Sequence, residues 1–329
     1  MGDTIGVVGA GRMGRGIALS YIFGGVPVLL VDLKERNSQE RELLIQSALE
    51  ELRRDLVFLA SIGLMESSDI DSCLARVSFS HFHDESRPLA HCPIIYEGVP
   101  EVMEAKIAAF EYIDAGAASD AIIASTTSTF LVTDLAGLVT APERFINAHW
   151  LNPAHLMPLV ELSRSEQTRP AVIDGIRASL ESIGKVPVVC SASPGYIVPR
   201  IQALAMNEAA RLVEEGVASA EDVDKAINVG FGLRFAVLGL LEFIDWGGGD
   251  ILHYASDYLS KTVGERYTAP DIIGENMRTG NNGLRDGQGF FDYSGTDTDA
   301  YRQKRMMDFV ALLKHRELLP KYMQSTGSD

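Results

Sequence analysis

A glycine-rich turn close to the start of the chain constrains the fold more than any other feature. Gly9, Gly11 and Gly14 form the pattern G-x-G-x-x-G, which follows the apolar segment TIGVV and opens the segment RMGRGIALSYIF. A second apolar segment, VPVLLVD, then ends at Asp32. A strand, a glycine turn, a helix and a second strand ending in an acid are typical of a dinucleotide-binding βαβ unit. We therefore expect the first half of the chain to be a Rossmann-type, doubly wound α/β sheet.

The cofactor follows from the same residues. Phosphates bind at a helix N-terminus, where free N–H groups and the helix dipole favour anions. The contacts expected at this turn are Gly9, Gly11, Arg12, Met13 and Gly14. The Asp32 carboxylate can hold both ribose hydroxyls and would repel a 2′-phosphate, which favours NAD over NADP. Lys34 and Arg36 follow Asp32 and could weaken that preference, and a glycine turn that binds nothing is the disfavoured alternative.

Length and charge limit the architecture and the partners. A chain of 329 residues exceeds one comfortable core and suggests two domains. Its 45 acidic and 29 basic residues give a net charge of −16, and both nucleic acid and anionic membranes require a basic surface. No apolar run reaches the roughly 20 residues that span a bilayer. We therefore expect a small-molecule substrate, no nucleic acid, no membrane and no metal.

Cysteine usage and the first residues predict the compartment. The three cysteines have no paired spacing, which is typical of a reducing cytosol: Cys73, Cys92 and Cys190. The first residues run directly into a strand without the pattern of a secretory signal. We expect a cytoplasmic protein.

The alternation of strands and helices predicts the domain limits. Further strands are expected at VSFS, PIIYEG, AIIAST, FINAHW and KVPVVC, with helices at 101–115 and 170–183. Residues 37–75 predict a hairpin of two helices, and from SPGYIVPR onward the pattern is helical. We predict a Rossmann domain over 1–190 with the hairpin as an insert, an all-α domain over 191–318, and a polar tail over 319–329.

One segment, HWLNPAHLMPLVEL, combines His149, Asn152 and Glu161 just beyond a predicted strand. Oxidation of an alcohol needs a base for the hydroxyl proton, and histidine titrates near neutrality. A carboxylate on its other ring nitrogen would fix the tautomer, and Glu161 stands in an otherwise apolar run. On spacing alone, a structural histidine with satisfied hydrogen bonds is an equal alternative.

The chain resembles the 3-hydroxyacyl-CoA dehydrogenase family along nearly its whole length. The motifs that carry the resemblance are GVVGAGRMGRGIA, EGVPEVMEAK, ASTTS, HWLNPAHLMPLVEL, PGYIV, NEAARLVEEGVASAEDVDKA and GLRDGQGFFDY. The resemblance implies an NAD-binding Rossmann domain followed by an all-helical dimerisation domain, and hence a homodimer. An amphipathic helix and the very apolar segment FAVLGLLEFIDW favour the same interface.

The family motif also implies roles for individual residues. The catalytic histidine and its glutamate fall on His149 and Glu161, while Asn152 and Ser128 are implied to hydrogen-bond the substrate oxygen. Glu101 and Lys106 fall on family residues beside the nicotinamide ribose, where Ser128 also lies. Without the resemblance, an exposed helix N-terminal acid and a solvated lysine would be the preferred interpretation of Glu101 and Lys106.

Three departures from the family fall on the substrate side. The family's Ser-Asn-Thr-Ser is STTS here, and the asparagine of P-G-F-(I/V)-x-N-R is Pro199. The family's G-H-P-M-G-P-L-E-L is replaced by GFGLRFAVLGLLEFIDWGGGD, which brings in Arg234 and Trp246. We predict that Pro199, Arg234 and Trp246 determine specificity. An arginine in this apolar run would be costly to bury unless it meets an anion, and an ion pair in a dimer interface is an equal alternative.

These observations together predict an NAD-dependent dehydrogenase of a short-chain L-3-hydroxyacyl-CoA, similar to 3-hydroxybutyryl-CoA. The alternative is a dehydrogenase of a free β-hydroxy carboxylate, bound through Arg234, or of a related small alcohol. A non-catalytic NAD-binding structural protein is the third and weakest possibility.

Overall fold

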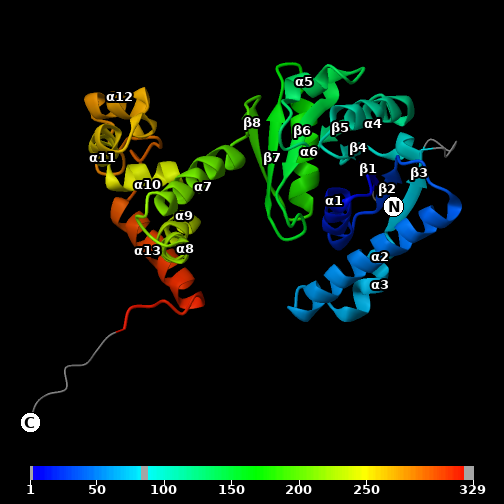
Figure 1. Ribbon diagram of the computed structural model, residues 1–329, viewed down its shortest axis with the longest axis horizontal. Helices are drawn as coiled ribbons and strands as arrows, with labels where there is room; N and C mark the ends of the chain where they lie inside the picture. Colours follow the sequence, from blue (N-terminus) through cyan, green and yellow to red (C-terminus); the bar gives the residue numbers. More distant parts are fainter. Residues whose placement is uncertain (1–2, 83–87, 322–329) are drawn as a thin grey trace, which may run out of the picture. The chain divides into compact units, whose positions relative to one another are not determined.

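The computed structural model describes residues 3–82 and 88–321, and contacts divide the chain into two units after Ala205 (Figure 1). The first unit contains one eight-stranded sheet in the order β3-β2-β1-β4-β5-β6-β7-β8. Its strands are β1 (Ile5–Val8), β2 (Val28–Asp32), β3 (Val77–His81), β4 (Ile94–Glu97), β5 (Ile122–Ser125), β6 (Phe145–Trp150), β7 (Leu159–Arg164) and β8 (Val186–Ser191). Neighbouring strands are parallel except for β6 and β7, which are antiparallel.

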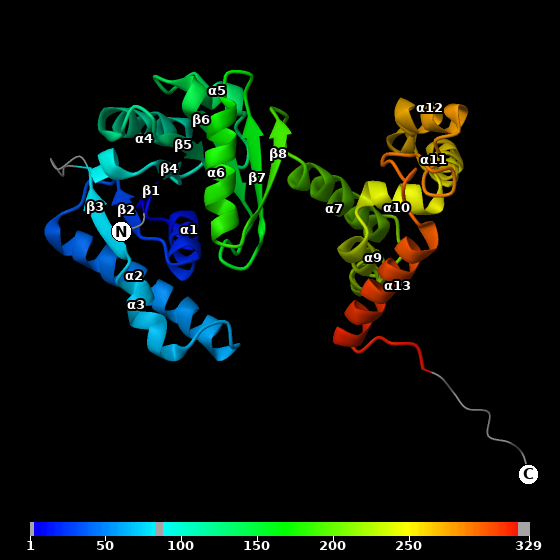
Figure 2. The ribbon, with the colours of Figure 1, turned by 180° about the vertical axis from the view of Figure 1, so that it is seen from behind.

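Helices cover both faces of this sheet. The helices of the first unit are α1 (Arg12–Phe23), α2 (Ser38–Ser61), α3 (Ile70–Leu74), α4 (Met103–Gly116), α5 (Val132–Ala136) and α6 (Pro170–Ser182). Apolar residues of α1, α2, α3 and α6 share one core, and those of α4 and α5 share the other. Figure 2 shows α6 lying across its face of the sheet. Alternate strand residues enter opposite cores, as Val7 and Val8 do, so this unit has the predicted doubly wound arrangement.

Residues 37–75 form α2 and the shorter α3. Asn37 caps α2 through a capping box with Glu40, in which each side chain accepts a hydrogen bond from the other residue's backbone N–H. Gly63 adopts φ +76 in the connection after α2, a conformation that glycine adopts without strain.

The second unit is helical, as the fold class predicts. It contains α8 (Ala220–Ala226), α9 (Gly232–Val237), α10 (Leu240–Gly247), α11 (Gly249–Thr262), α12 (Asp271–Thr279) and α13 (Thr298–His315). The helix α7 (Val198–Glu214) crosses the division between the units. The predicted boundary at 191 coincides with the end of β8, whereas contacts assign the first part of α7 to the sheet unit. Residues 322–329 of the predicted polar tail lie outside the described residues.

A buried acid organises the glycine-rich segment GLRDGQGFFDY of the second unit. The Asp245 carboxylate accepts hydrogen bonds from the backbone N–H groups of Phe290 and Phe291 and from the Tyr293 hydroxyl. A Cβ atom on Gly289 would lie 2.2 Å from Asp245 Oδ1, so only glycine fits there.

No single helix of the described chain is long and apolar enough to cross a membrane. The bent pair Ala220–Val237 and Leu240–Gly247, with an angle of 88°, meets that test on length and composition alone.

Candidate active site

The glycine turn opens into a cavity of about 620 Å³. Helix α1 begins at Arg12, and its N-cap residue Gly11 makes no side-chain capping bond, so the first-turn N–H groups have no side-chain partner there. The predicted cofactor residues that line the cavity are Gly9, Gly11, Arg12, Met13 and Asp32. This arrangement suits a pyrophosphate at the helix N-terminus.

Two glycines of the motif are required by close backbone contacts. Gly9 has φ +115, and a Cβ atom there would lie 2.6 Å from the Gly98 carbonyl oxygen. A Cβ atom on Gly14 would lie 1.9 Å from the carbonyl oxygen of Gly9. The backbone segments at this turn therefore pack as closely as a dinucleotide-binding turn requires.

Asp32 ends β2 beside this cavity. Its carboxylate forms an ion pair with Arg36, with 2.6 Å between Oδ2 and Nε. The positive charge of Arg36 is thus matched by Asp32, and this pairing reduces the capacity of Arg36 to attract a 2′-phosphate.

His149 and Glu161 stand directly opposite each other in the antiparallel ladder of β6 and β7. The distance from His149 Nδ1 to Glu161 Oε2 is 2.8 Å, and the Glu161 residue is 0% exposed. The other carboxylate oxygen, Oε1, accepts hydrogen bonds from the backbone N–H groups of Ile197 and Val198 at 2.9 and 2.8 Å. Both glutamate oxygens are therefore occupied, and the imidazole is held with Nε2 as the remaining ring nitrogen.

Ser128 and Asn152 follow the carboxyl ends of neighbouring parallel strands, β5 and β6. Ser125 pairs with Asn147 in that ladder, so both strands end at the same edge of the sheet. Ser128 and Asn152 are both exposed. The structure thus brings Ser128, Asn152 and the His149–Glu161 pair to one edge, where ligands of open α/β sheets bind.

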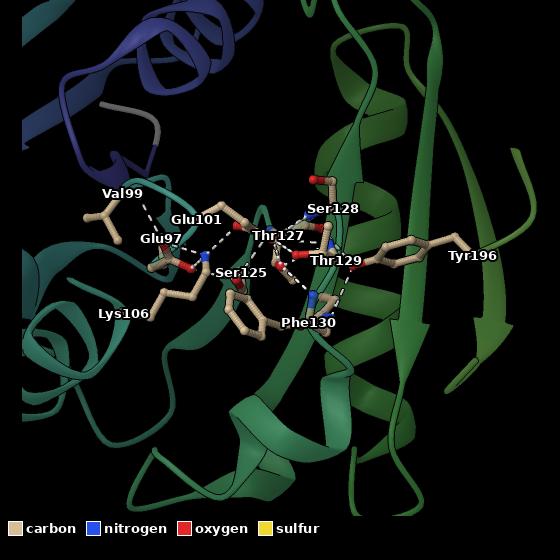
Figure 3. Close-up of polar contacts among 11 residues, drawn as sticks. Glu97, Val99, Glu101, Lys106, Ser125, Thr127, Ser128, Thr129, Phe130 and Tyr196 are labelled. Atoms are coloured by element: carbon tan, nitrogen blue, oxygen red, sulfur yellow. Dashed lines mark hydrogen bonds and ion pairs between the residues drawn. The ribbon is translucent and has the colours of Figure 1, made fainter. Parts of the chain in front are cut away.

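Lys106 lies at the centre of a buried polar network behind this edge (Figure 3). Its Nζ donates to both carboxylate oxygens of Glu97, at 3.2 and 3.0 Å, and lies 3.1 Å from Glu101 Oε2. Glu97 also accepts from the Ser125 hydroxyl and from the Val99 N–H. The interpretation of Lys106 as a solvated lysine is wrong, because its side chain is 0% exposed.

Glu101 holds the loop that carries Ser128. Its Oε1 accepts from the backbone N–H groups of Ser128 and Thr129, at 3.1 and 3.0 Å, and from the hydroxyls of Thr127 and Thr129. Burial alone would raise the pKa of Glu101, but the two threonine hydroxyls and the Lys106 ammonium outweigh it and lower that pKa to about 2. Glu101 therefore remains a carboxylate throughout the neutral range. Glu101 is exposed and lies just before α4, as the alternative interpretation expects, but its carboxylate is bonded to the Ser128 loop and to Lys106.

Lys185 holds the loop between β6 and β7, which carries Asn152. Its Nζ donates to the carbonyl oxygens of Ala154 and Met157 at 2.6 and 2.9 Å, and the Ser20 hydroxyl of α1 also donates to the Ala154 oxygen. Burial lowers the pKa of the Lys185 ammonium to about 8. The substrate-side loop is thus anchored both to Lys185, the residue before β8, and to Ser20 of the cofactor helix.

The three predicted specificity residues lie outside this cluster of contacts. Pro199 is in the first turn of α7, whereas Arg234 and Trp246 line a cavity of about 300 Å³ within the second unit. The expected cost of burying Arg234 does not arise, because the residue is exposed, with its guanidinium carbon 5.7 Å from the centre of the Phe243 ring. No carboxylate within residues 3–82 and 88–321 forms an ion pair with Arg234.

Two residues of the site were missed from sequence. Glu97 was taken only as part of a strand, although a charged residue in the apolar segment PIIYEG was a usable signal. Tyr196 stacks on the His149 ring, and its hydroxyl is the only change from the phenylalanine of the P-G-F motif at that position. Among the described residues, no group of histidine, cysteine and acidic side chains is arranged to hold a metal ion.

Comparison with known proteins identifies the family of both parts of the chain. Residues 4–193 match the family model for the 3-hydroxyacyl-CoA dehydrogenase NAD-binding domain, and residues 195–293 match the C-terminal domain of the same family. The chain is 30% identical over 311 residues to 5-formyl-3-hydroxy-2-methylpyridine 4-carboxylate 5-dehydrogenase of Mesorhizobium japonicum, covering 94% of this chain and 96% of that protein.

Two further relatives also cover most of the chain. A probable 3-hydroxybutyryl-CoA dehydrogenase of Bacillus subtilis is 30% identical over 87% of this chain and 96% of its own. The crystal structure of a 3-hydroxyacyl-CoA dehydrogenase from Archaeoglobus fulgidus superposes with a TM-score of 0.76 at 31% identity, covering 97% of this chain and 100% of that one. With both domains present in order and the NAD turn intact, the chain belongs to the 3-hydroxyacyl-CoA dehydrogenase family, NAD-dependent oxidoreductases that act on CH–OH groups.

Proposed function

We propose that His149 is the general base that removes the hydroxyl proton of the substrate, with Glu161 as its partner. The observation that carries the proposal is the buried 2.8 Å contact between His149 Nδ1 and Glu161 Oε2. This contact fixes the tautomer, leaves Nε2 to accept the proton, and offsets the positive charge that the imidazole then carries. General acid–base catalysis of this kind contributes about 10²–10⁴-fold to a rate.

The remaining residues bind and orient. NAD held at the glycine turn supplies the acceptor for the hydride. Asp32 binds its ribose, and Glu101 and Lys106 support the nicotinamide end, by the resemblance to the family. Ser128 and Asn152 donate hydrogen bonds to the substrate oxygen, which carries developing negative charge when a ketone is reduced. In the reductive direction the His149 imidazolium returns the proton.

The leading substrate is a short-chain L-3-hydroxyacyl-CoA, similar to 3-hydroxybutyryl-CoA. Retention of both family domains and the similarity to the Bacillus subtilis protein support it.

A free β-hydroxy carboxylate or related small alcohol is the second candidate, and two observations favour it. By the resemblance to the family, the hairpin at 37–75 covers the CoA end of the substrate, and Arg53 and Arg54 are its only adjacent basic pair. Both are matched by acids, Arg53 by Asp71 at 2.7 Å and Arg54 by Asp55 at 3.5 Å, so neither is a free cation for the CoA phosphates. A relative that covers nearly the whole chain is named for a pyridine carboxylate without CoA.

We also propose that the chain forms a homodimer through its helical unit. On α11, Ile251, Tyr254 and Tyr258 follow one another at helical spacing, and each is more than 60% exposed. A stripe of large apolar side chains of this kind favours burial against a partner, and a second copy supplies the same stripe.

The test is an NADH-linked screen of acetoacetyl-CoA beside free β-keto acids, with the unmodified chain and His149→Gln. We expect His149→Gln to lose most turnover while NADH binding stays within about twofold. His91→Gln, which removes an exposed histidine elsewhere in the sheet unit, is the matched control. Near-normal kcat in His149→Gln would contradict the assignment of the base, and no turnover of any substrate by the unmodified chain would favour the non-catalytic alternative.

A further inference from the structure

Tyr196, in the segment between β8 and α7, contacts both halves of the proposed site. Its ring is stacked on the His149 imidazole, with 4.8 Å between ring centroids and 15° between planes. Glu161 holds the imidazole at Nδ1 from the opposite strand. The Tyr196 ring thus restricts rotation of the imidazole out of its plane, a motion that a single hydrogen bond leaves free.

The Tyr196 hydroxyl contacts the loop that carries Ser128 (Figure 3). It donates to the Thr127 carbonyl oxygen at 2.7 Å and accepts from Asn147 Nδ2 at 3.1 Å. Asn147 Nδ2 also donates to the Phe130 carbonyl oxygen at 3.1 Å. Burial raises the pKa of Tyr196, which keeps the hydroxyl protonated as a donor. The carbonyl side of the loop is therefore held by Asn147 and Tyr196, and its amide side by Glu101.

The backbone conformation of Tyr196 is strained, which indicates that the surrounding structure holds this residue in place. Its φ is +48, in the left-handed region that bulky residues rarely adopt, and it follows Gly195 at φ +77. Such a conformation persists only where the surroundings over-determine it. The next two residues, Ile197 and Val198, donate their N–H groups to Glu161, so the same short segment fixes both partners of the imidazole.

We infer that Tyr196 is a positioning residue that sets the His149 imidazole and the Ser128 loop in fixed relation to each other. The inference rests on the proposed function of His149. The ring and the hydroxyl perform separate tasks: the ring orients the imidazole, and the hydroxyl orients the loop. Tyr196→Phe removes only the second task, whereas Tyr196→Leu removes both.

The expected effects differ accordingly. Loss of one hydrogen bond changes a rate or affinity by about fivefold, so Tyr196→Phe should lower kcat/KM by about that factor, mainly through KM. Tyr196→Leu releases the base as well and should lower kcat by about 10²-fold, as small misplacements of a catalytic group do. Tyr21→Phe is the matched control. It removes a buried hydroxyl bonded to Tyr96 and Ser179, away from His149, and should leave kcat/KM unchanged.

A spectroscopic measurement tests the stacking without any substrate. In protein labelled at histidine, the His149 ring protons should show an upfield ring-current shift, with His149→Gln assigning the resonance among the 7 histidines. The shift should persist in Tyr196→Phe and vanish in Tyr196→Leu.

The outcomes separate the two claims. An unchanged His149 resonance in Tyr196→Leu, or a kcat within about twofold of the unmodified value, overturns the positioning role. Retained turnover in His149→Gln overturns the proposed base instead, and the ring-current result then still reports on the contact itself. Loss of kcat in Tyr196→Leu with recovery of kcat in Tyr196→Phe supports the inference.

Discussion

Replacement of Lys106 by methionine tests whether the buried network behind the site is held together by its single cation. In Lys106→Met, the Glu97 carboxylate keeps the Ser125 hydroxyl and the Val99 N–H but loses its only positive neighbour among the described residues. Removing one partner of a fully buried ion pair costs about 3–5 kcal/mol, because an uncompensated charge remains. Both side chains here are 0% exposed, so solvent screening does not reduce that figure.

A second substitution separates charge from packing. Glu97→Gln in the Lys106→Met background leaves a neutral amide beside an apolar chain of similar length. We expect the double variant to unfold with a free energy closer to the unmodified chain than Lys106→Met alone, with a coupling of at least about 2 kcal/mol. Arg53→Met is the control, since Arg53 and Asp71 form an exposed pair in the same unit and such pairs contribute less than about 1 kcal/mol.

Urea denaturation followed by Trp150 fluorescence, in a Trp246→Phe background, reports on the sheet unit alone. Trp150 is buried in β6, and Trp246 is the other tryptophan of the chain. A Lys106→Met variant that unfolds within 1 kcal/mol of its background would refute the reasoning. The reasoning would also be refuted if the double variant lost more free energy of unfolding than the two single variants lose together.

Asp32→Ala should narrow the preference for NADH over NADPH, measured as the ratio of kcat/KM values; equal values in the unmodified enzyme would contradict the role of Asp32. Light scattering at micromolar concentration should show a dimer, and Tyr254→Arg combined with Tyr258→Arg should yield a monomer; a monomeric unmodified chain excludes the interface. Burial lowers the pKa of Lys185 from its ordinary 10.5 to about 8 in the folded chain. Between pH 8 and pH 10.5 the unfolded chain therefore binds more protons than the folded chain, so the free energy of unfolding should rise with pH over that window. Urea midpoints at pH 8 and pH 10 should show that this rise is absent in Lys185→Met.

The local pattern of apolar residues and turn residues was sufficient to predict most of the helices and strands. The strand FINAHW is β6 residue for residue, and the helix predicted at 170–183 is α6 to within one residue. The glycine motif predicted the turn because two of its requirements are local, the positive φ of Gly9 and the close approach of Gly14 to the Gly9 carbonyl oxygen, whereas the approach of Gly9 to Gly98 depends on the fold.

Contacts between distant residues were not predictable in the same way. Lys106 has a sequence environment typical of a solvated lysine, and only the fold places Glu97 beneath it. Tyr196 and Thr127 are 69 residues apart, and no periodicity links them. Arg234 stands among apolar residues in sequence yet is exposed, because the short helix α9 leaves its side chain at the surface. The resemblance supplied His149 and Glu161 together, whereas spacing alone left a structural histidine as an equal alternative.

The antiparallel pairing of β6 and β7 has a consequence for how this scaffold can be re-engineered. His149 and Glu161 are matched by ladder register, not by the residues 151–158 that connect their strands. Insertions, deletions or grafted sequences in that connection should therefore leave the proposed proton-transfer pair in contact, provided that carbonyl acceptors for Lys185 remain. A one-residue slip of β7 against β6 would instead turn Glu161 to the opposite face and disable the pair outright. The proposed acid–base pair thus depends on the two strands, so the connection between them can be varied without disturbing that pair, as long as residue 152 still donates to the substrate oxygen.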